Sequence, residues 1–378
     1  MMKKLLSMIL AVAMLLSMAS IAVAEDAGNY KIAILTGTTT QGEEEYYAAK
    51  TLIEKYGDKV IHDTYPDNFS SEVETTISKL MAFAADPEVK AIIFVQGVQG
   101  ATAAFTQIRE TRPDILLVCG VPAEDPADIG AAADIVLAVD EIGCGYQVAD
   151  KAYEWGCDVI VHYSFARHLS YETIVAKRDA MKMTAENYGI EFVERDCPDP
   201  TGDAGMSGAQ AAVLEDVPKV MEEYAGKKVC FYCTNCGIQV ALQQAVIEQE
   251  NAYYALPCCP SPYHGYQEAF GLEATYGDID GAIANLAAFL ETKDATGRFS
   301  TWSIPVNMSM INGAYEYACQ WAEGKLAEKI DEAKLSECFA AAAGSEVSFD
   351  TYTDATGTKI GNYYLIAFSP INFADYLK

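Results

Sequence analysis

Short β-branched runs alternate with amphipathic stretches from residue 30 onward. The apolar runs predict strands at 31–36, 59–64, 91–96, 115–120, 135–140, 158–163, 190–195, 228–234 and 252–257. Periodic apolar positions between them predict helices near 43–56, 71–85, 101–111, 143–155, 171–188, 208–225 and 237–249. Strands and helices that alternate in this way are typical of parallel βαβ units, not of a sandwich or a helix bundle.

The rhythm changes in the last hundred residues. There the pattern predicts a helix near 279–292, a strand at 299–304, helices near 308–324 and 331–343, and a hairpin with strands at 346–352 and 363–368. A chain of this length exceeds one ordinary core, so two lobes are expected. We assign 25–142 plus about 303–343 to lobe 1, and 143–302 plus about 344–378 to lobe 2, with a hinge of several strands.

The N-terminus has the three parts of a secretory signal peptide. Lys3 and Lys4 precede an apolar run from Leu5 to Leu16, and small residues end at Ala24. The run is too short to span a membrane, which needs about 20 residues. Because no cysteine stands near the cleavage point, we expect cleavage near Ala24 and a secreted, periplasmic or cell-envelope protein without a membrane anchor.

The charge of the chain is strongly negative. Its 54 acidic residues face 26 Lys and Arg, for a formal net charge of -28. Such a surface repels phosphate backbones, so no nucleic-acid partner is expected.

The order of segments carries a family resemblance. A signal peptide, the sequence KIAILTGTTTQGEEE, strand–helix repeats, a crossover near 140–147 and a second βα series together resemble the type I periplasmic-binding-protein fold. Within that fold the chain resembles an uncharacterised family of secreted proteins of anaerobic bacteria, known as a domain of unknown function.

This resemblance implies an α/β protein with two Rossmann-like lobes that close on a small polar molecule, such as a sugar, a nucleoside or an amino acid. It also implies that the ligand is handed to a membrane transporter, such as the permease of an ABC transporter, or to a membrane receptor. We expect a monomer without a cofactor. The same fold serves as the effector domain of some cytosolic regulators. Here a signal peptide, and no helix-turn-helix, precedes the fold.

Ligands of open parallel sheets bind beyond the carboxyl ends of the strands, so the loops there supply the candidate residues. In the first lobe these are Thr38 and Thr39 in a glycine-hydroxyl loop, Tyr65 after the second strand, and Gln96 and Gln99 after the third. The alternative for the two threonines is that they only cap the following helix.

The second lobe offers Arg167 and His168 after one strand and Asn235 after another. Arg167 could hold a ligand carboxylate bidentately, with His168 adding a hydrogen bond. The alternative for Arg167 is an interdomain salt bridge. Trp302 could stack on a ligand near a crossover, and core packing is the alternative.

A cysteine pattern suggests a second class of function. It consists of Cys230-x-x-Cys233-x-x-Cys236, then Cys258-Cys259, with His264 beyond. Adjacent strands would bring Cys236 and Cys258 to one sheet edge, where thiolates bind zinc or an iron–sulfur cluster. Cys230 and Cys233 point to opposite faces, however, which a shared site cannot use. The main expectation is therefore free thiols and no metal. The alternatives are a metal held by Cys233, Cys236, Cys258 and Cys259, with the histidine as a possible further ligand, and a disulfide from Cys236 to Cys258 or Cys259.

Enzyme signatures are missing from the sequence. It has no G-x-S-x-G elbow and no H-E-x-x-H motif, and it contains four histidines. We therefore expect a binding protein rather than an enzyme, with a hydrolase as a minor alternative.

Overall fold

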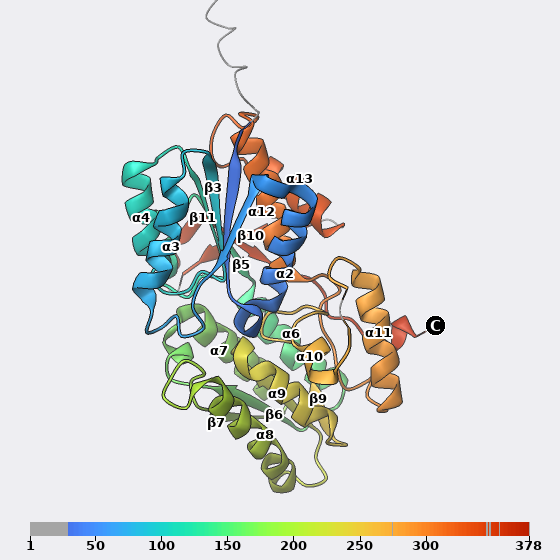
Figure 1. Ribbon diagram of the computed structural model, residues 1–378. Coiled ribbons are helices and arrows are strands. Elements are labelled where there is room, and N and C mark those ends of the chain that lie inside the picture. Colours follow the sequence, from blue (N-terminus) through green and yellow to red (C-terminus); the bar gives the residue numbers. More distant parts are fainter. Residues whose placement is uncertain (1–28, 274, 345–346, 348, 355, 378) are drawn as a thin grey trace, which may run out of the picture.

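The computed structural model describes residues 29–377, apart from 274, 345–346, 348 and 355. The expected signal peptide lies outside these residues. Figure 1 shows two lobes one above the other, each built on its own sheet. The first sheet has the strand order β10-β11-β5-β4-β3-β1-β2, and the second has the order β7-β6-β8-β9.

The elements follow the predicted alternation closely. The strands are β1 Lys31–Thr36, β2 Val60–Thr64, β3 Val89–Val95, β4 Leu116–Gly120, β5 Ile135–Val139, β6 Val159–Ser164, β7 Glu191–Asp196, β8 Val229–Cys233, β9 Ala252–Tyr254, β10 Phe349–Thr353 and β11 Lys359–Ile366. The α-helices are α2 Thr39–Tyr56, α3 Val73–Ala85, α4 Ala101–Thr111, α5 Pro126–Ala132, α6 Glu141–Glu154, α7 Glu172–Asn187, α8 Gly205–Glu223, α9 Cys236–Ile247, α10 Tyr266–Phe270, α11 Ile279–Thr292, α12 Val306–Ala322 and α13 Glu332–Ala343.

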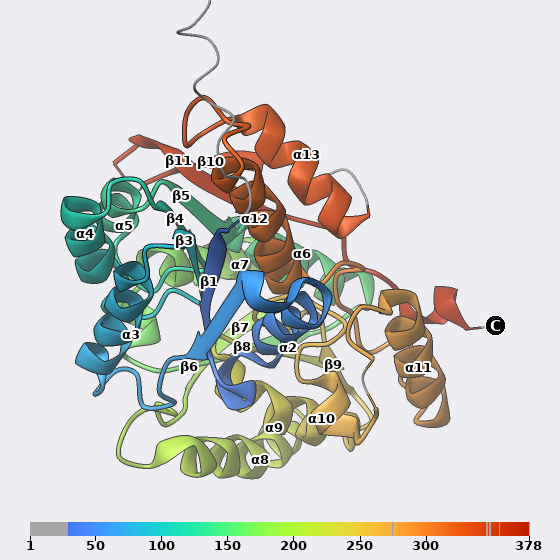
Figure 2. The same ribbon diagram turned by 45° about the horizontal axis from the view of Figure 1, so that its top comes forward.

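Both faces of the first sheet are buried, as expected of parallel strands. In β1, Ile32 and Ile34 pack into an apolar cluster with residues of α2 and α12, whereas Ala33 and Leu35 face a cluster with residues of α3 and α4. Figure 2 shows α2, α12 and α13 side by side over the first of these faces. The N-terminal strand is therefore covered by a helix from the C-terminal third of the chain.

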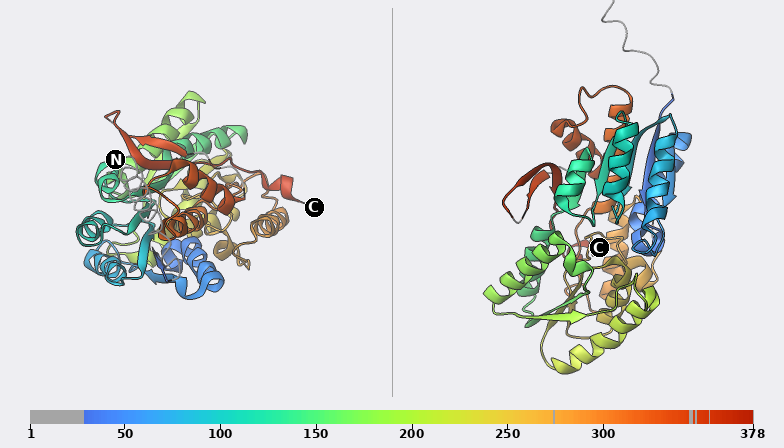
Figure 3. Two further views of the ribbon diagram at one scale, coloured as in Figure 1. Left: turned by 90° about the horizontal axis from the view of Figure 1, so that it is seen from above. Right: turned by 90° about the vertical axis from the view of Figure 1, so that its left-hand side faces the viewer.

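The C-terminal hairpin corrects the division into lobes. The sequence predicts 344–378 in lobe 2, but β11 pairs in parallel with β5, and Tyr363 lies opposite Val136. Alternate residues of β11 are buried on the two faces of the first sheet, with Tyr363 on one face and Tyr364 on the other. This burial draws the hairpin into the first lobe, where the right-hand view of Figure 3 shows it in red. The other boundaries stay a prediction.

The chain passes between the lobes near the start of α6, near Trp302 and after β11. The predicted strand at 299–304 is wrong: this segment forms only isolated bridges, Tyr254 with Phe299 and Trp302 with Pro370. Beyond Pro370 the tail packs Phe373 into the apolar cluster of the second lobe. Paired chain passages at Trp302 and Pro370 thus link the lobes side by side.

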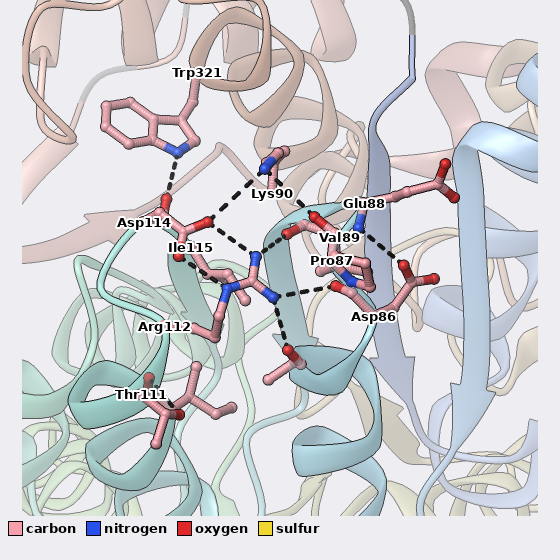
Figure 4. Close-up of polar contacts among 12 residues, drawn as sticks. Asp86, Pro87, Glu88, Val89, Lys90, Thr111, Arg112, Asp114, Ile115 and Trp321 are labelled. Atoms are coloured by element: carbon pink, nitrogen blue, oxygen red, sulfur yellow. Dashed lines mark hydrogen bonds and ion pairs between the residues drawn. The ribbon is translucent and has the colours of Figure 1, made fainter.

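Arg112 fastens the end of the first lobe that lies away from the second. Its guanidinium donates to the carbonyls of Ala84 (2.8 Å) and Val89 (3.0 Å) and to both carboxylate oxygens of Asp114 (2.9 Å each). Figure 4 shows this side chain bridging the segments before β3 and before β4. The amino ends of these strands are therefore fixed, and the carboxyl ends face the other lobe.

Candidate functional site

The two sheets turn their switch points toward one another. Strand order reverses between β1 and β3 in the first sheet and between β6 and β8 in the second, which is where ligands of such sheets bind. The loops that follow these strands line a small cavity, with about 80 Å³ of space for water-sized molecules. Its lining includes Gln41, Gln96, Val98 and Ala123 from the first lobe and Arg167, His168, Lys177, Asn235, Cys236, Cys258 and Cys259 from the second.

The two glutamines predicted after β3 both lie at the boundary between the lobes. The Nε2 of Gln96 donates to the carbonyl of Gln41 (3.2 Å) and to Oε1 of Glu45 (3.0 Å). It also lies 3.6 Å from the Cys236 sulfur of the second lobe. Gln99 donates to the Tyr171 hydroxyl across the boundary and does not line the cavity. Gln96 is thus the better placed of the two for a ligand.

The other first-lobe candidates lie outside this cavity. Thr38 is the N-cap of α2, with its hydroxyl accepting from the backbone N–H of Thr40 (3.3 Å) and donating to Asp67. Thr39 is exposed and lines a separate open depression. Tyr65 is buried, with its ring edge-on to Phe69 at a centroid distance of 5.6 Å. The capping alternative therefore describes Thr38, and Tyr65 belongs to the core.

Arg167 reaches the cavity but already holds a carboxylate. Its Nε lies 2.7 Å from Oδ2 of Asp199 and its second terminal nitrogen 2.8 Å from Oδ1, a bidentate pair. A third donor reaches the Tyr171 hydroxyl at 2.9 Å, and the guanidinium also lies 5.4 Å from the Phe69 ring centroid. Because Asp199 belongs to the second lobe, this ion pair is not the interdomain one considered from the sequence.

His168 and Asn235 form one network at the carboxyl ends of β6 and β8. Nε2 of His168 lies 3.1 Å from Nδ2 of Asn235, and Nδ1 lies 3.1 Å from the Thr234 hydroxyl. Burial, with the neighbouring Arg167 charge, lowers the pKa of His168 to about 3, so the ring is neutral. The Asn235 amide then donates to Nε2, while its oxygen caps α9 at the Gly237 N–H (2.8 Å).

Trp302 lies in the hinge region, not in the cavity. Its indole N–H donates to Oε1 of Gln147 at 2.7 Å, and its ring meets Phe368 edge-on at a centroid distance of 5.6 Å. The packing alternative describes this residue.

Some of the cysteines in the predicted pattern lie close together, but the residues of the cluster differ from the four cysteines predicted as metal ligands. Ligand atoms of Cys236, Cys258, Cys259 and His264 lie within 4.8 Å of one another. Cys233 is buried in the apolar cluster on one face of the second sheet, and Cys230 in the cluster on the other. The strand alternation that separates these two residues thus removes Cys233 from the set, and His264 takes its place. All eleven cysteines lie among the described residues, and all are free.

A buried lysine beside the thiols has no counterpart in the sequence analysis. Lys177 forms an ion pair with Glu141, and its Nζ lies 2.9 Å from the Tyr232 hydroxyl and 3.4 Å from the Cys258 carbonyl oxygen. Burial lowers the pKa of Lys177. Within the amphipathic helix of 171–188 a lysine reads as a solvent-facing residue, so only the tertiary structure reveals this one.

Three consecutive carboxylates at the start of α2 are a second unanticipated feature. Glu43 accepts from the backbone N–H of Gly265 in the second lobe, and Glu44 from that of Met308, both at 2.8 Å. Burial raises the pKa of Glu43 to about 7 and that of Glu44 to about 8. Glu45 accepts from Gln96 and from Asn307, and burial raises its pKa as well. Glu43 and Glu44 are therefore neutral or partly neutral acids near pH 7.

Two parallel α/β lobes that meet at their switch points define a type I periplasmic-binding-protein fold, which confirms the predicted fold class. The chain belongs to the family described as "Protein of unknown function (DUF3798)", which matches residues 30–300. This match confirms the resemblance drawn from the sequence.

Two relatives come from Treponema pallidum (strain Nichols), each described as "Uncharacterized protein". One is 36% identical over 181 residues, covering 46% of this chain and 82% of the relative. The other is 36% identical over 161 residues, covering 41% of this chain and 72% of the relative.

Solved structures share the fold at low sequence identity. A Clostridium difficile 630 crystal structure, whose description proposes a transcriptional regulator, has a TM-score of 0.71 at 21% identity and covers 91% of this chain and 99% of its own. An ABC-transporter periplasmic solute binding protein of Actinobacillus succinogenes 130z with bound D-allose has a TM-score of 0.55 at 12% identity, covering 82% and 99%. A sugar ABC transport substrate-binding protein of Bordetella parapertussis 12822 has a TM-score of 0.55 at 10% identity, covering 92% and 90%. Such identities establish the fold alone.

Proposed function

We propose that the protein is an extracytoplasmic solute-binding protein that captures a small polar molecule between its lobes and delivers it to a transporter permease. The observation that carries this proposal is the cavity at the two facing switch points, with polar side chains from both lobes in its lining. A molecule bound there would hold the lobes together, which is how a receptor reports that it is loaded.

The chemistry of the lining suits a sugar, a nucleoside or an amino-acid-like solute. Ligand cavities place a few polar groups on a largely apolar wall. Here Val98 and Phe69 supply apolar wall, and the amides of Gln96 and Asn235 donate and accept hydrogen bonds. The sugar-binding structures of the same fold support a sugar as the first class to test.

The N-terminal segment supports an extracytoplasmic location. Among the residues that the structure describes, no helix combines the length and the apolar character that a membrane crossing requires. A gene regulator is the alternative that the Clostridium difficile structure suggests. The signal-peptide pattern of residues 1–24 favours the receptor. Catalysis is not part of the proposal.

A solute screen with a cavity-filling variant tests the proposal. Purified residues 25–378 would be screened by thermal shift against sugars, nucleosides and amino acids. A solute at 100 times its Kd stabilises the folded state by about 2.7 kcal/mol. Ala123→Trp places an indole in the cavity, and Ala127→Trp, on an exposed site of α5, is its matched control.

We expect a solute that shifts the melting temperature of the wild type and of Ala127→Trp but not of Ala123→Trp. The proposal is wrong if well-folded protein responds to none of these classes, or if Ala123→Trp binds the solute as tightly as the control does.

A further inference from the structure

We propose that Cys236, Cys258, Cys259 and His264 form a tetrahedral site for one thiophilic divalent metal ion, with Zn²⁺ as the ion it fits best. Three thiolates and one imidazole are a donor set that zinc takes in proteins. The site lies entirely in the second lobe and does not depend on the proposed solute-binding function.

The distances are close to those that a single ion imposes. Zinc–sulfur bonds of about 2.3 Å in a tetrahedron place two sulfur atoms about 3.8 Å apart. The sulfurs of Cys236 and Cys258 are 3.3 Å apart, and the Cys258 sulfur is 3.5 Å from Nε2 of His264. All four ligand atoms fall within 4.8 Å of one another. The ligand atoms that lie farthest apart would have to approach each other by up to about 1 Å to complete the shell.

Local structure holds the ligands in these places. Cys236 is the first residue of α9 and follows β8, while Cys258 and Cys259 follow β9, which pairs in parallel with β8. From α9, the Gln239 side chain accepts from the Cys258 backbone N–H at 2.8 Å and donates to the His264 carbonyl at 2.9 Å. One amide thus fixes both ends of the loop that carries three of the four ligands.

Lys177 also contacts the backbone of the ligand loop. This buried side chain, which pairs with Glu141, donates to the Cys258 carbonyl oxygen at 3.4 Å. Three thiolates around a divalent ion leave one net negative charge. When the ion binds, each of the three cysteines gives up its thiol proton to solvent and uses the sulfur lone pair for the metal bond.

Competing explanations leave parts of the cluster unused. A disulfide from Cys236 to Cys258 or Cys259 would use two sulfurs and leave the third thiol and the imidazole without a role. An iron–sulfur cluster fills the space between its ligands and spreads them farther apart than a single ion does. One ion uses all four groups at the separations observed.

The site also has a defined position in the molecule. Cys236, Cys258 and Cys259 line the cavity between the lobes. The metal would therefore form part of the cavity floor, next to Gln96, whose Nε2 lies 3.6 Å from the Cys236 sulfur.

The test is metal analysis of residues 25–378 produced without a histidine tag and purified anaerobically. We expect one zinc per chain by plasma mass spectrometry, and an X-ray absorption spectrum with three sulfur neighbours and one nitrogen. Co²⁺ added to the stripped protein would give the thiolate charge-transfer and tetrahedral d–d bands of a sulfur-rich site. Cys258→Ser should lose the bound zinc and the cobalt bands. Cys338→Ser, which removes a thiol on α13 of the first lobe, should keep the zinc and the bands.

Gln239→Leu tests the positioning role of the amide that holds the loop. We expect it to weaken zinc binding by about 10–100-fold in competition with a chelator, because residues that orient metal ligands contribute on this scale. The X-ray absorption spectrum of the wild type identifies the metal ligands without any variant. The proposal therefore stays testable even if Cys258→Ser does not fold.

Metal-free protein that binds no Co²⁺, or a mapped disulfide in the anaerobic preparation, would overturn the proposal. So would cobalt bands that survive in Cys258→Ser. None of these measurements uses a solute, so the metal site and the solute-binding function can fail separately.

Discussion

Replacing Glu44 by glutamine should remove a pH-dependent loss of stability. Glu44 has 0% of its surface exposed, and burial, with the neighbouring Glu45 charge, raises its pKa to about 8. The folded state therefore holds a proton that the unfolded chain, with an ordinary glutamate pKa near 4.5, has already lost. The unfolded state binds fewer protons in this range, so the free energy of unfolding falls as pH rises and levels off above pH 8.

The size of the effect follows from the shift. Each pKa unit corresponds to about 1.4 kcal/mol, so deprotonation through a pKa of about 8 costs roughly 2 kcal/mol between pH 6.5 and pH 8.5. The buried neutral histidines still add an opposite slope just above pH 6.5, but they do so equally in the wild type and in Glu44→Gln, so the difference between the two proteins reports Glu44. Glutamine keeps the acceptor for the Met308 N–H and carries no charge at any pH.

Urea unfolding at pH 6.5 and pH 8.5 measures this difference. The wild type should lose about 2 kcal/mol more than Glu44→Gln between the two pH values. Glu54→Gln, at an exposed site of the same helix, should behave as the wild type does. Equal slopes for the wild type and Glu44→Gln, or a steeper slope for the variant, would refute the buried neutral carboxyl group.

Two further changes probe the packing of each lobe. Gly145→Ala should destabilise by about 1–3 kcal/mol, because a Cβ there would lie 2.4 Å from the Lys177 carbonyl oxygen on α7. Gly361→Ala is the control, because a Cβ there meets nothing within 4 Å. It should leave the midpoint of unfolding in guanidinium chloride unchanged or raise it. Equal losses of stability in the two variants would contradict the close packing of α6 on α7. Arg112→Lys should cost about 1–3 kcal/mol in the same assay, because an ammonium cannot reproduce the forked bonds to Asp114 and the backbone carbonyls; an unchanged midpoint would show that this cluster adds nothing.

Periodicity predicted most of the fold because parallel strands here are continuous apolar runs. β1 and α4 begin and end at the predicted residues, and the other parallel strands are shifted or shortened by a few residues. The C-terminal hairpin shows the limit of this reasoning. Its strands were predicted from alternation, but the sheet that receives them is set by burial against β5, which no local pattern encodes.

The site was predicted only in part for a similar reason. Strand-end loops identified Gln96, His168 and Asn235, because the topology of parallel sheets places such loops at the cavity. The topology of the sheets could not distinguish Thr38, which caps a helix, from a residue that contacts a ligand. Topology also missed Lys177, because a charged residue within a predicted helix gives no sign that neighbouring elements of its own lobe bury it.

The place of α12 has a consequence for how this protein is made. The family match ends at residue 300, yet α12 starts at Val306 and its Met310 and Ile311 cover the sheet face formed by Ile32, Ile34 and Ile93. A ribosome that has released only the first 300 residues has delivered β1 to β5 of the first sheet with α2 on this apolar face, but without α12. Residue 300 is therefore an end of recognisable sequence and not of a folding unit, and the first lobe completes its core only when the last part of the chain has been synthesised.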